Sequence, residues 1–342
     1  ILKMINEIKN HFILVDKCAE ETRIVEIKSN KIVKITCWQD EKPPLIGKVL
    51  DAEVLKTLNS GIARAILKNK KIITVRVGSK VLKTNEKIKV IITSEEFENK
   101  PIQAKLQSGN CNFEKKNDVK RIIELFFNKK IPVIEDNHAV YWNNMDLESC
   151  FLSALEPMIK IEDGGVLWIE KTKAATIIDV DTKNKLINNE NDMLKFCKDV
   201  FLRCMDEIKL RNIGGMILID FPRVSLNRKK ILHEFISKEG IKKVPDSNFL
   251  GFSRLQLYEM YVPRNFKPLE SFYINKNEFD LKNHIRSLWR ASKKIKSKNN
   301  IEFLCGKNLY KRLKLKKIPE FINIVERIDL PNDFGELLEK KI

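Results

Sequence analysis

The sequence predicts a mixed α+β protein: a β-rich N-terminal segment with an inserted small barrel of OB type, then an α/β domain with a basic helical C-terminal part. Three observations support this. Short strand-like apolar runs fill the first 107 residues, a strand–helix–strand pattern spans residues 174–221, and the last 70 residues are dense in lysine and arginine. At 342 residues with 43% hydrophobic content, the chain can build two or three cores.

The first third of the chain consists of short apolar runs. Residues 10–38 hold three such runs, which predict a hairpin or a meander. Five more follow, at Ile46–Val54, Gly61–Leu67, Ile72–Val77, Ile88–Thr93 and Ile102–Leu106. Five short strands within about 60 residues suit a small OB-type barrel, with a fragment of a sandwich as the alternative. We therefore place segment limits at residues 1–40 and 41–107.

A polar break over residues 108–118 predicts a linker. Helices are expected from about Asp118 to Asn128 and from about Asp146 to Met158. A turn then leads into a strand over Val166–Ile169. These elements divide the remainder into a segment 108–160 and an α/β domain 161–342.

Two apolar runs each end in an aspartate. They are Ala174–Asp181 and Gly214–Phe221, and the residues from Glu190 to Asn212 between them have helix length and spacing. A strand, a helix and a strand in this order most often form a right-handed unit with two parallel strands. Ligands gather at the carboxyl ends of such strands, so Asp179 and Asp220 are expected there, as neighbours.

Each aspartate has an ordinary explanation, because a carboxylate at a strand end can cap a turn or pair with a basic side chain. Two carboxylates that converge repel each other, and a bound divalent cation offsets that repulsion. Asp181 lies two residues beyond Asp179 and offers a third oxygen on the same side of the strand. Together with Asp220 these residues are candidate ligands of Mg²⁺, which keeps several waters and binds substrate phosphates.

Beyond Asp220 the pattern predicts a helix over about Leu226–Glu239, a short apolar strand over Phe252–Leu257 and then basic helices. The basic cluster comprises Arg286, Arg290, Lys293, Lys294, Lys296 and Lys298, followed by Lys307, Lys311, Arg312, Lys314, Lys316 and Lys317. It can hold a nucleic acid by counterion release, or it can be an ordinary solvated face.

The net charge of +18 favours a polyanionic partner, either nucleic acid or an acidic membrane surface. The alternative cause is compositional drift, because lysine, asparagine and isoleucine are abundant in chains encoded by AT-rich genomes. The seven cysteines contain no CxxC spacing and are expected to be reduced and mostly buried. No apolar stretch reaches membrane-span length and no signal-peptide layout is visible, so a cytoplasmic protein is expected. Trp168, Trp289 and most phenylalanines are expected in the core.

Three segments resemble the ribonuclease E/G family of bacterial endoribonucleases: Gly164–Asp181, Lys209–Phe221 and Ser253–Met260. They occur in the order of that family and at about its spacing. The resemblance implies that segments 1–40 and 108–160 contribute to an RNase-H-like part, that 41–107 is an RNA-binding barrel, and that 161–342 is the catalytic domain.

The resemblance also implies a Mg²⁺-dependent endoribonuclease that cuts single-stranded RNA internally and leaves 5′-phosphate and 3′-hydroxyl ends, with Mn²⁺ as a substitute metal. The two metal-binding aspartates of the family carry over to Asp179 and Asp220, whereas Asp181 stands where the family has asparagine. Asp179, Asp220 and Asp181 are thus the candidate catalytic residues. Arg211, Arg254 and Arg264 are candidate RNA contacts, with a helix-terminal charge and solvated arginines as the alternatives.

Several departures from the family matter. Its long 5′-end-sensing region is expected to be largely missing. No cysteine pair follows Glu259-Met260, so neither zinc nor a zinc-linked tetramer is expected, and a homodimer is left as an open alternative. The barrel segment contains a single aromatic residue, Phe97, which supplies little base stacking. An RNA-binding protein without nuclease activity is therefore the alternative, and a phosphatase or DNA nuclease with the same metal chemistry is a third hypothesis.

Overall fold

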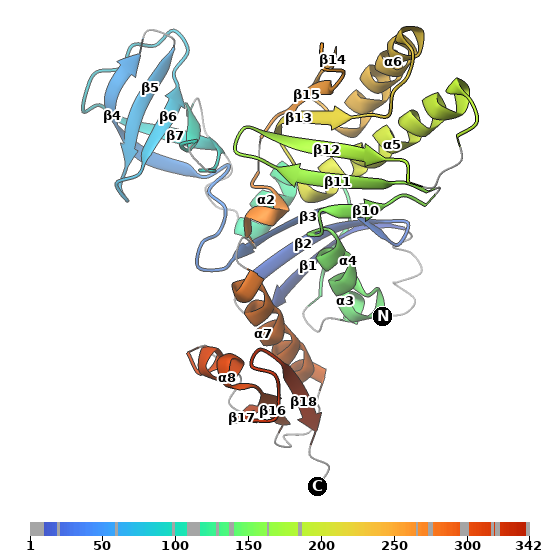
Figure 1. The fold of residues 1–342 in the computed structure, drawn as a ribbon. Coiled ribbons are helices and arrows are strands. Elements are labelled where there is room, and N and C mark those ends of the chain that lie inside the picture. Colours follow the sequence, from blue (N-terminus) through green and yellow to red (C-terminus); the bar gives the residue numbers. More distant parts are fainter. Residues whose placement is uncertain are drawn as a thin grey trace.

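The computed structural model describes residues 10–18, 21–58, 61–97, 100–107, 117–127, 130–136, 140–162, 164–183, 187–264, 266–272, 276–294, 301–315, 318 and 322–339. Most of the predicted linker, together with Cys111, Lys296, Lys298, Lys316 and Lys317, lies outside these residues. The described strands form a four-stranded sheet, a closed barrel, a six-stranded sheet and a three-stranded sheet, as Figure 1 shows.

The N-terminal runs form the predicted meander. The four-stranded sheet has the order β3-β2-β1-β9, with β1 at His11–Cys18, β2 at Glu21–Lys28, β3 at Lys31–Gln39 and β9 at Val133–Glu135. Helices α2 (Asp118–Phe126), α3 (Val140–Asn144) and α4 (Leu147–Ser153) pack on it. Leu14 faces Trp142 and Phe151 of α3 and α4, whereas Ile13 faces Ile122 of α2, because successive side chains of a strand point to opposite faces.

The inserted segment closes into the predicted barrel, which excludes the sandwich alternative. Its order is β4-β5-β6-β8-β7, with β4 at Val49–Leu58, β5 at Ile62–Leu67, β6 at Ile72–Arg76, β7 at Lys87–Ser94 and β8 at Gln103–Leu106. Val54, Ile73 and Val90 fill the interior beside the small side chains of Ala63 and Ala104. A five-stranded barrel has little internal space, so alanines opposite branched residues fit its interior.

The six-stranded sheet contains the predicted parallel strand–helix–strand unit. Its order is β10-β11-β12-β13-β15-β14, with β10 at Met158–Lys160, β11 at Val166–Lys171, β12 at Ala175–Asp181, β13 at Gly215–Asp220, β14 at Asn248–Phe252 and β15 at Tyr258–Val262. Strands β12 and β13 are parallel, and helix α5 (Glu190–Arg211) connects them. Helix α6 (Leu226–Lys243) joins α5 on one face of the sheet.

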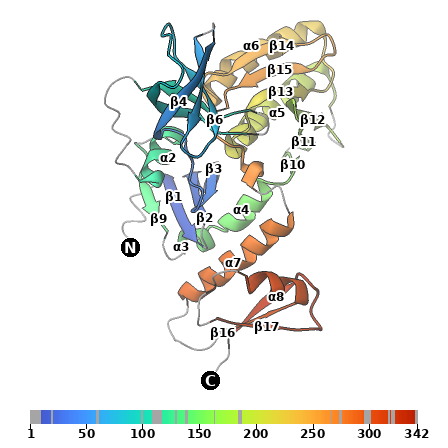
Figure 2. The ribbon, with the colours of Figure 1, turned by 90° about the vertical axis from the view of Figure 1, so that its left-hand side faces the viewer.

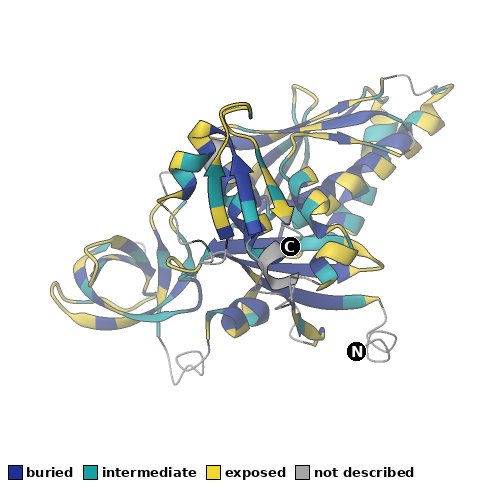
Figure 3. Cartoon of the chain, turned by 90° about the horizontal axis from the view of Figure 1, so that it is seen from below, coloured by how far each residue is buried: buried dark blue, intermediate teal, exposed yellow. Residues whose placement is uncertain are grey.

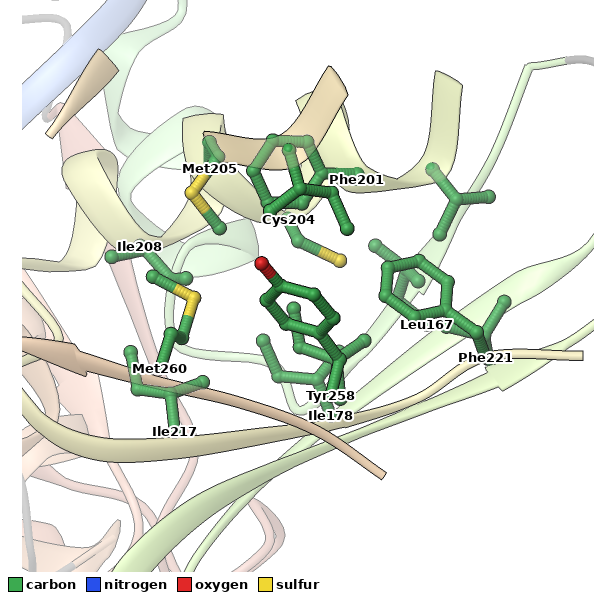
Figure 4. Close-up of a cluster of buried hydrophobic side chains, with 14 of the residues drawn as sticks. Leu167, Ile178, Phe201, Cys204, Met205, Ile208, Ile217, Phe221, Tyr258 and Met260 are labelled. Carbon is green, nitrogen blue, oxygen red and sulfur yellow. The ribbon is translucent and has the colours of Figure 1, made fainter. Parts of the chain in front are cut away.

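The core of this unit lies between the sheet and α5. Figure 4 shows Tyr258 of β15 pointing toward Phe201, Cys204 and Met205 of the helix. The side chain of Asn189 caps the start of α5 by accepting hydrogen bonds from the backbone N–H groups of two residues in the first turn. The other face of the sheet is left uncovered by these helices.

One predicted strand is wrong. Residues Phe252–Leu257 contain three apolar residues, yet Phe252 ends β14 and Ser253–Leu257 form the turn into β15. The Ser253 N–H donates to the carbonyl of Leu257 at 2.8 Å, and Leu255 is 82% exposed. Three apolar residues among six are too few to distinguish a strand from a turn whose side chains remain in solvent.

The C-terminal part contains strands that the sequence analysis did not predict. Helices α7 (Lys276–Lys294) and α8 (Lys307–Leu313) accompany a sheet of order β17-β16-β18, with β16 at Ile301–Cys305, β17 at Ile322–Glu326 and β18 at Gly335–Glu339. Figure 2 shows α7 between this unit and the N-terminal sheet. A short 3₁₀ helix, η1 (Leu269–Phe272), precedes α7.

Two members of the predicted basic cluster are not on the surface. Arg286 and Arg290 are 1% and 7% exposed, so neither belongs to a solvated face or to an open nucleic-acid surface. They form ion pairs with Asp16 of β1, and Arg290 also pairs with Glu148 of α4. None of the helices in the described part of the chain is long and apolar enough to span a bilayer.

Candidate active site

The face of the six-stranded sheet opposite α5 and α6, called the open face below, carries exposed side chains. Burial alternates along β12 and β13, as Figure 3 shows for the strands in general. The exposed positions are Trp168, Glu170, Ile177, Asp179, Asp181, Met216, Asp220 and Tyr261. At these positions the face is accessible to a ligand.

Asp179 and Asp220 are neighbours on the open face, at the edge formed by the carboxyl ends of β12 and β13. They are paired positions in the register of the parallel strands β12 and β13, which confirms their expected arrangement at the carboxyl ends. Adjacent strands lie about 4.8 Å apart, so two side chains on the same face at this register lie next to each other. Among the described residues, none forms an ion pair or a side-chain hydrogen bond with Asp220.

The electrostatics of the pair favour a cation. Partial burial raises the pKa of the Asp179 carboxyl, and the charges of Asp220, Asp181 and Glu170 raise it further against one opposing backbone hydrogen bond from Val180. A carboxylate whose pKa is raised by neighbouring negative charges lies in an electrostatic setting in which a divalent cation binds favourably. The donor set, two exposed carboxylates on adjacent strands, fits Mg²⁺ completed by waters and phosphate oxygens.

Asp181 makes a different contact. Its Oδ1 accepts a hydrogen bond from the backbone N–H of Lys183 at 2.8 Å, which closes the turn after β12. Within the described ranges, no three histidine, cysteine, aspartate or glutamate side chains converge in a metal-binding arrangement. A metal at this edge would thus have Asp179 and Asp220 as its protein ligands, and the catalytic role of Asp181 stays a prediction.

Arg254 lies at the same edge as the aspartates. The pairing of Ile219 with Tyr258 places the β14–β15 turn beside the carboxyl end of β13, and Arg254 is exposed on that turn. Arg223 is also exposed there, three residues after Asp220, and no described residue forms an ion pair with it. The sequence analysis missed Arg223, although a basic residue three positions after a strand-end aspartate could have been predicted to lie near that aspartate.

Arg264 lies at the opposite end of the strands, next to the start of β13. There it borders a basic cavity between the barrel and the sheet. Its Nε donates to the carbonyl of Gly214 at 2.8 Å. The cavity has a volume of about 320 Å³. The basic residues in its lining are Arg76, Lys100, Lys105, Lys171, Arg264 and Lys267, against the acidic residues Glu95 and Glu270. This site, called the barrel cavity below, suits an anionic ligand.

The single aromatic residue of the barrel segment lies in this cavity. The Nζ of Lys171 is 3.7 Å from the centre of the Phe97 ring, and the guanidinium carbon of Arg264 is 5.8 Å from it. Tyr261, on the open face, also lines the barrel cavity. The cavity thus joins the barrel to the open face.

Arg211 is placed away from both sites. It is 7% exposed, its Nε donates to Glu207 at 2.8 Å and one of its amino groups donates to the carbonyl of Glu156 at 2.6 Å. These bonds anchor the end of α5, and the RNA-binding role of Arg211 stays a prediction. Arg254 and Arg264 therefore lie at opposite edges of the sheet, and the structure does not bring the three arginines together.

Trp168 is not the core residue that the sequence analysis expects. It is 37% exposed on the open face, and its register partner on β12 is Asp179. An apolar run such as Val166–Ile169 does not reveal which of its alternate residues faces the helices. Five of the six described cysteines are buried, as expected, and Cys150 is exposed.

Comparison with known proteins finds one family and several relatives that are all ribonucleases. The sequence profile of the Ribonuclease E/G family matches residues 52–265. Over 161 residues the chain is 29% identical to Ribonuclease G of Haemophilus influenzae, covering 43% of this chain and 32% of that protein. It is 30% identical over 139 residues to Ribonuclease G of Escherichia coli, covering 38% and 27%. It is 27% identical over 156 residues to the Putative ribonuclease E of Buchnera aphidicola, covering 44% and 38%. The matches thus span about a third of the length of these relatives.

Proposed function

The chain belongs to the ribonuclease E/G family, and from that premise we propose that it is an endoribonuclease that hydrolyses internal phosphodiester bonds of single-stranded RNA with Mg²⁺. The observation that carries the proposal is the pairing of Asp179 with Asp220 on the open face. Mn²⁺ is the proposed substitute metal, and no zinc is assigned. The cytoplasm is the proposed location, in keeping with the described cysteines, all six of which are free thiols.

Asp179 and Asp220 would hold the metal, which supplies an activated water and polarises a phosphoryl oxygen when bound. Their side chains point from adjacent strands to the same side, so one phosphate can reach both through a shared ion. Arg223 and Arg254, exposed at the same edge, would hold the phosphates on either side of the cleaved bond. Their fixed positive charge also stabilises the negative charge that develops in the transition state.

The barrel cavity supports an RNA substrate. Arg76 of β6 and Lys105 of β8 are paired positions on adjacent strands and both line the cavity. Like charges directly opposite each other destabilise a sheet, and a bound phosphate chain relieves that repulsion. Phe97, with Lys171 over its ring, adds an aromatic surface. An RNA strand held here would continue along the open face toward Asp220.

The alternative function, RNA binding without cleavage, also has an observation in its favour. Five carboxylates lie on the open face, on Glu170, Asp179, Asp181, Asp220 and Glu259. Without a cation this face repels RNA, and the barrel cavity alone would then hold it. A homodimer is compatible with both functions.

The test compares Asp220→Asn with a matched control, Asp246→Asn. Both changes remove one exposed carboxylate from the same domain, and Asp246 lies in the turn before β14, where asparagine suits its positive φ. With a 5′-labelled single-stranded RNA, we expect Asp220→Asn to lower Mg²⁺-dependent cleavage by a factor on the order of 10² or more. The control should cleave normally.

Three further outcomes discriminate between the hypotheses. Cleavage by purified Asp220→Asn at the rate of the unchanged protein would overturn the metal assignment. RNA binding with a steep salt dependence, but no cleavage in Mg²⁺ or Mn²⁺ by the unchanged protein, would establish the binding function instead. Cleavage of single-stranded DNA but not RNA of the same sequence would favour a DNA nuclease.

A further inference from the structure

The exposed indole of Trp168 is unusual for this chain. Trp38 and Trp142 are 3% and 1% exposed and Trp289 is partly buried, whereas Trp168 is 37% exposed on a face that carries several carboxylates beside the apolar side chains of Ile177, Met216 and Tyr261. Among the described residues, no aromatic ring or cation lies against the Trp168 indole, and no acceptor bonds its N–H. The exposed part of the indole is an apolar, planar surface on which an aromatic group of a ligand could stack.

The position of Trp168 relates it to the proposed metal ligands. Trp168 pairs with Asp179, and Asp179 pairs with Asp220, so the three form one row across β11, β12 and β13. Side chains directly opposite on the same face have Cβ atoms about 4.5–5.5 Å apart. The indole is thus one strand away from the position where a phosphate would meet the metal.

The other side of Trp168 is apolar. Its register partner on the edge strand β10 is Met158, which is 37% exposed. A planar apolar group could lie over Trp168 and Met158, while a phosphate attached to it could reach Asp179 and Asp220. A nucleotide has this arrangement of groups, with an aromatic base at one end and a phosphate at the other.

We propose that Trp168 is a stacking platform for one nucleobase of the single-stranded RNA, beside the bond that is cleaved. This proposal rests on the proposed function. It makes Trp168 a positioning residue: the indole holds the base, and the base fixes the adjacent phosphate over Asp179 and Asp220. Stacking accepts every base, because each has a π face, so the platform selects unpaired RNA rather than a sequence. A base paired in a duplex cannot lie on the indole, so structured RNA is excluded here.

The first experiment combines Trp168→Ala with RNAs that carry a single abasic nucleotide at each position around the mapped cleavage site. Loss of one base–aromatic stack, worth about 1–3 kcal/mol, corresponds to a roughly 5- to 150-fold fall in kcat/KM. We expect this fall for the unchanged protein when one specific nucleotide next to the cleaved bond is abasic. Trp168→Ala should show the fall with normal RNA and no further fall with that abasic RNA.

Two control variants separate stacking from general damage to the sheet. Trp168→Phe keeps an aromatic ring and should retain sensitivity to the abasic position. Leu250→Ala removes an exposed apolar side chain from β14, at the other edge of the sheet, and should behave like the unchanged protein. Equal responses of unchanged protein and Trp168→Ala to every abasic position would overturn the proposal.

A second experiment needs no cleavage and keeps the inference separate from the proposed function. Titration of the unchanged protein with single-stranded RNA in Ca²⁺ should quench tryptophan fluorescence, because Trp168 is the exposed indole among those described, and Trp168→Phe should lose most of that quenching. Quenching without cleavage would sustain the stacking platform while the nuclease proposal fails. Bound RNA that leaves the fluorescence unchanged would overturn the platform, as would a Trp168→Ala effect confined to the oligomeric state.

Discussion

Arg286 of α7 forms an ion pair with Asp16 of β1, 270 residues away in sequence, and both side chains are almost completely buried. The same guanidinium donates to Glu21 at 3.2 Å and to the carbonyl of Cys18 at 3.1 Å. Because three further charged residues, Arg23, Glu148 and Arg290, complete the network, its three positive and three negative charges balance. The network fixes the helix that leads into the C-terminal unit onto the N-terminal sheet.

Replacing Arg286 by methionine should destabilise the protein by about 3–5 kcal/mol, because it leaves Asp16 with one fewer buried counter-charge. Ser287→Ala on the same helix is the control, since Ser287 is exposed. Denaturant unfolding monitored by circular dichroism measures both variants. Equal midpoints for the two variants would contradict the structural role of Arg286.

Stability should fall in acid partly through Glu148. Burial alone would raise the pKa of this carboxyl, but the charges and hydrogen bonds of Arg23 and Arg290 outweigh burial and lower the pKa from 4.5 to about 2. A depressed folded-state pKa means that the contribution is fully present above pH 4.5 and is lost as the pH falls toward 2. Unfolding free energies across this window should fall less steeply for Glu148→Gln than for the unchanged protein; identical slopes would exclude this contribution.

Gly215 should tolerate no side chain. It starts β13 with a φ of +104°, and a Cβ built there would lie 2.2 Å from an amino nitrogen of Arg264. We expect Gly215→Ala to cost about 2 kcal/mol or more, from backbone strain and displacement of Arg264. Adding Arg264→Ala should recover the part due to the clash, because the strain alone then remains. A double variant no more stable than Gly215→Ala would show that Arg264 is not the obstacle.

Neutralising two charges of the barrel cavity should weaken RNA binding in a salt-dependent way. For Arg76→Gln with Lys105→Gln, we expect the slope of log affinity against log salt to fall by about 1.4, as each phosphate contact on a single strand contributes roughly 0.7. Lys70→Gln with Lys80→Gln is the control, because it removes the same charge from exposed barrel positions outside the cavity. The same change of slope in both pairs would mean that the barrel binds RNA without using the cavity.

Local patterns were sufficient for the barrel and for the parallel β12–β13 unit. Short β-branched runs and a helix-length interval determine these elements, and the apolar pattern fixes a register in which Asp179 meets Asp220. The exposure of Trp168 was not readable, because β11 has apolar residues on both faces and only the packed helices define its inner face.

The burial of Arg286 and Arg290 could not be predicted for another reason. Their acidic partner Asp16 is distant in sequence, and a lysine-rich neighbourhood resembles a solvated helix. Strands β16 to β18 were missed because each is only five residues long and lysine-rich segments precede and follow β16. The role of a residue whose partner is distant in sequence can be recognised only once the three-dimensional structure is known.

The length of β13 sets the distance between the barrel cavity and Asp220. Arg264 and the barrel cavity adjoin Gly214, just before the strand begins, and Asp220 ends the strand six residues later. Six extended residues span about 17–20 Å, so an RNA that engages both ends must bridge that distance. Oligonucleotides shorter than this span could not occupy the barrel cavity and reach Asp220 at once. The protein, rather than the RNA sequence, would then set the spacing between the cavity and the cleaved bond.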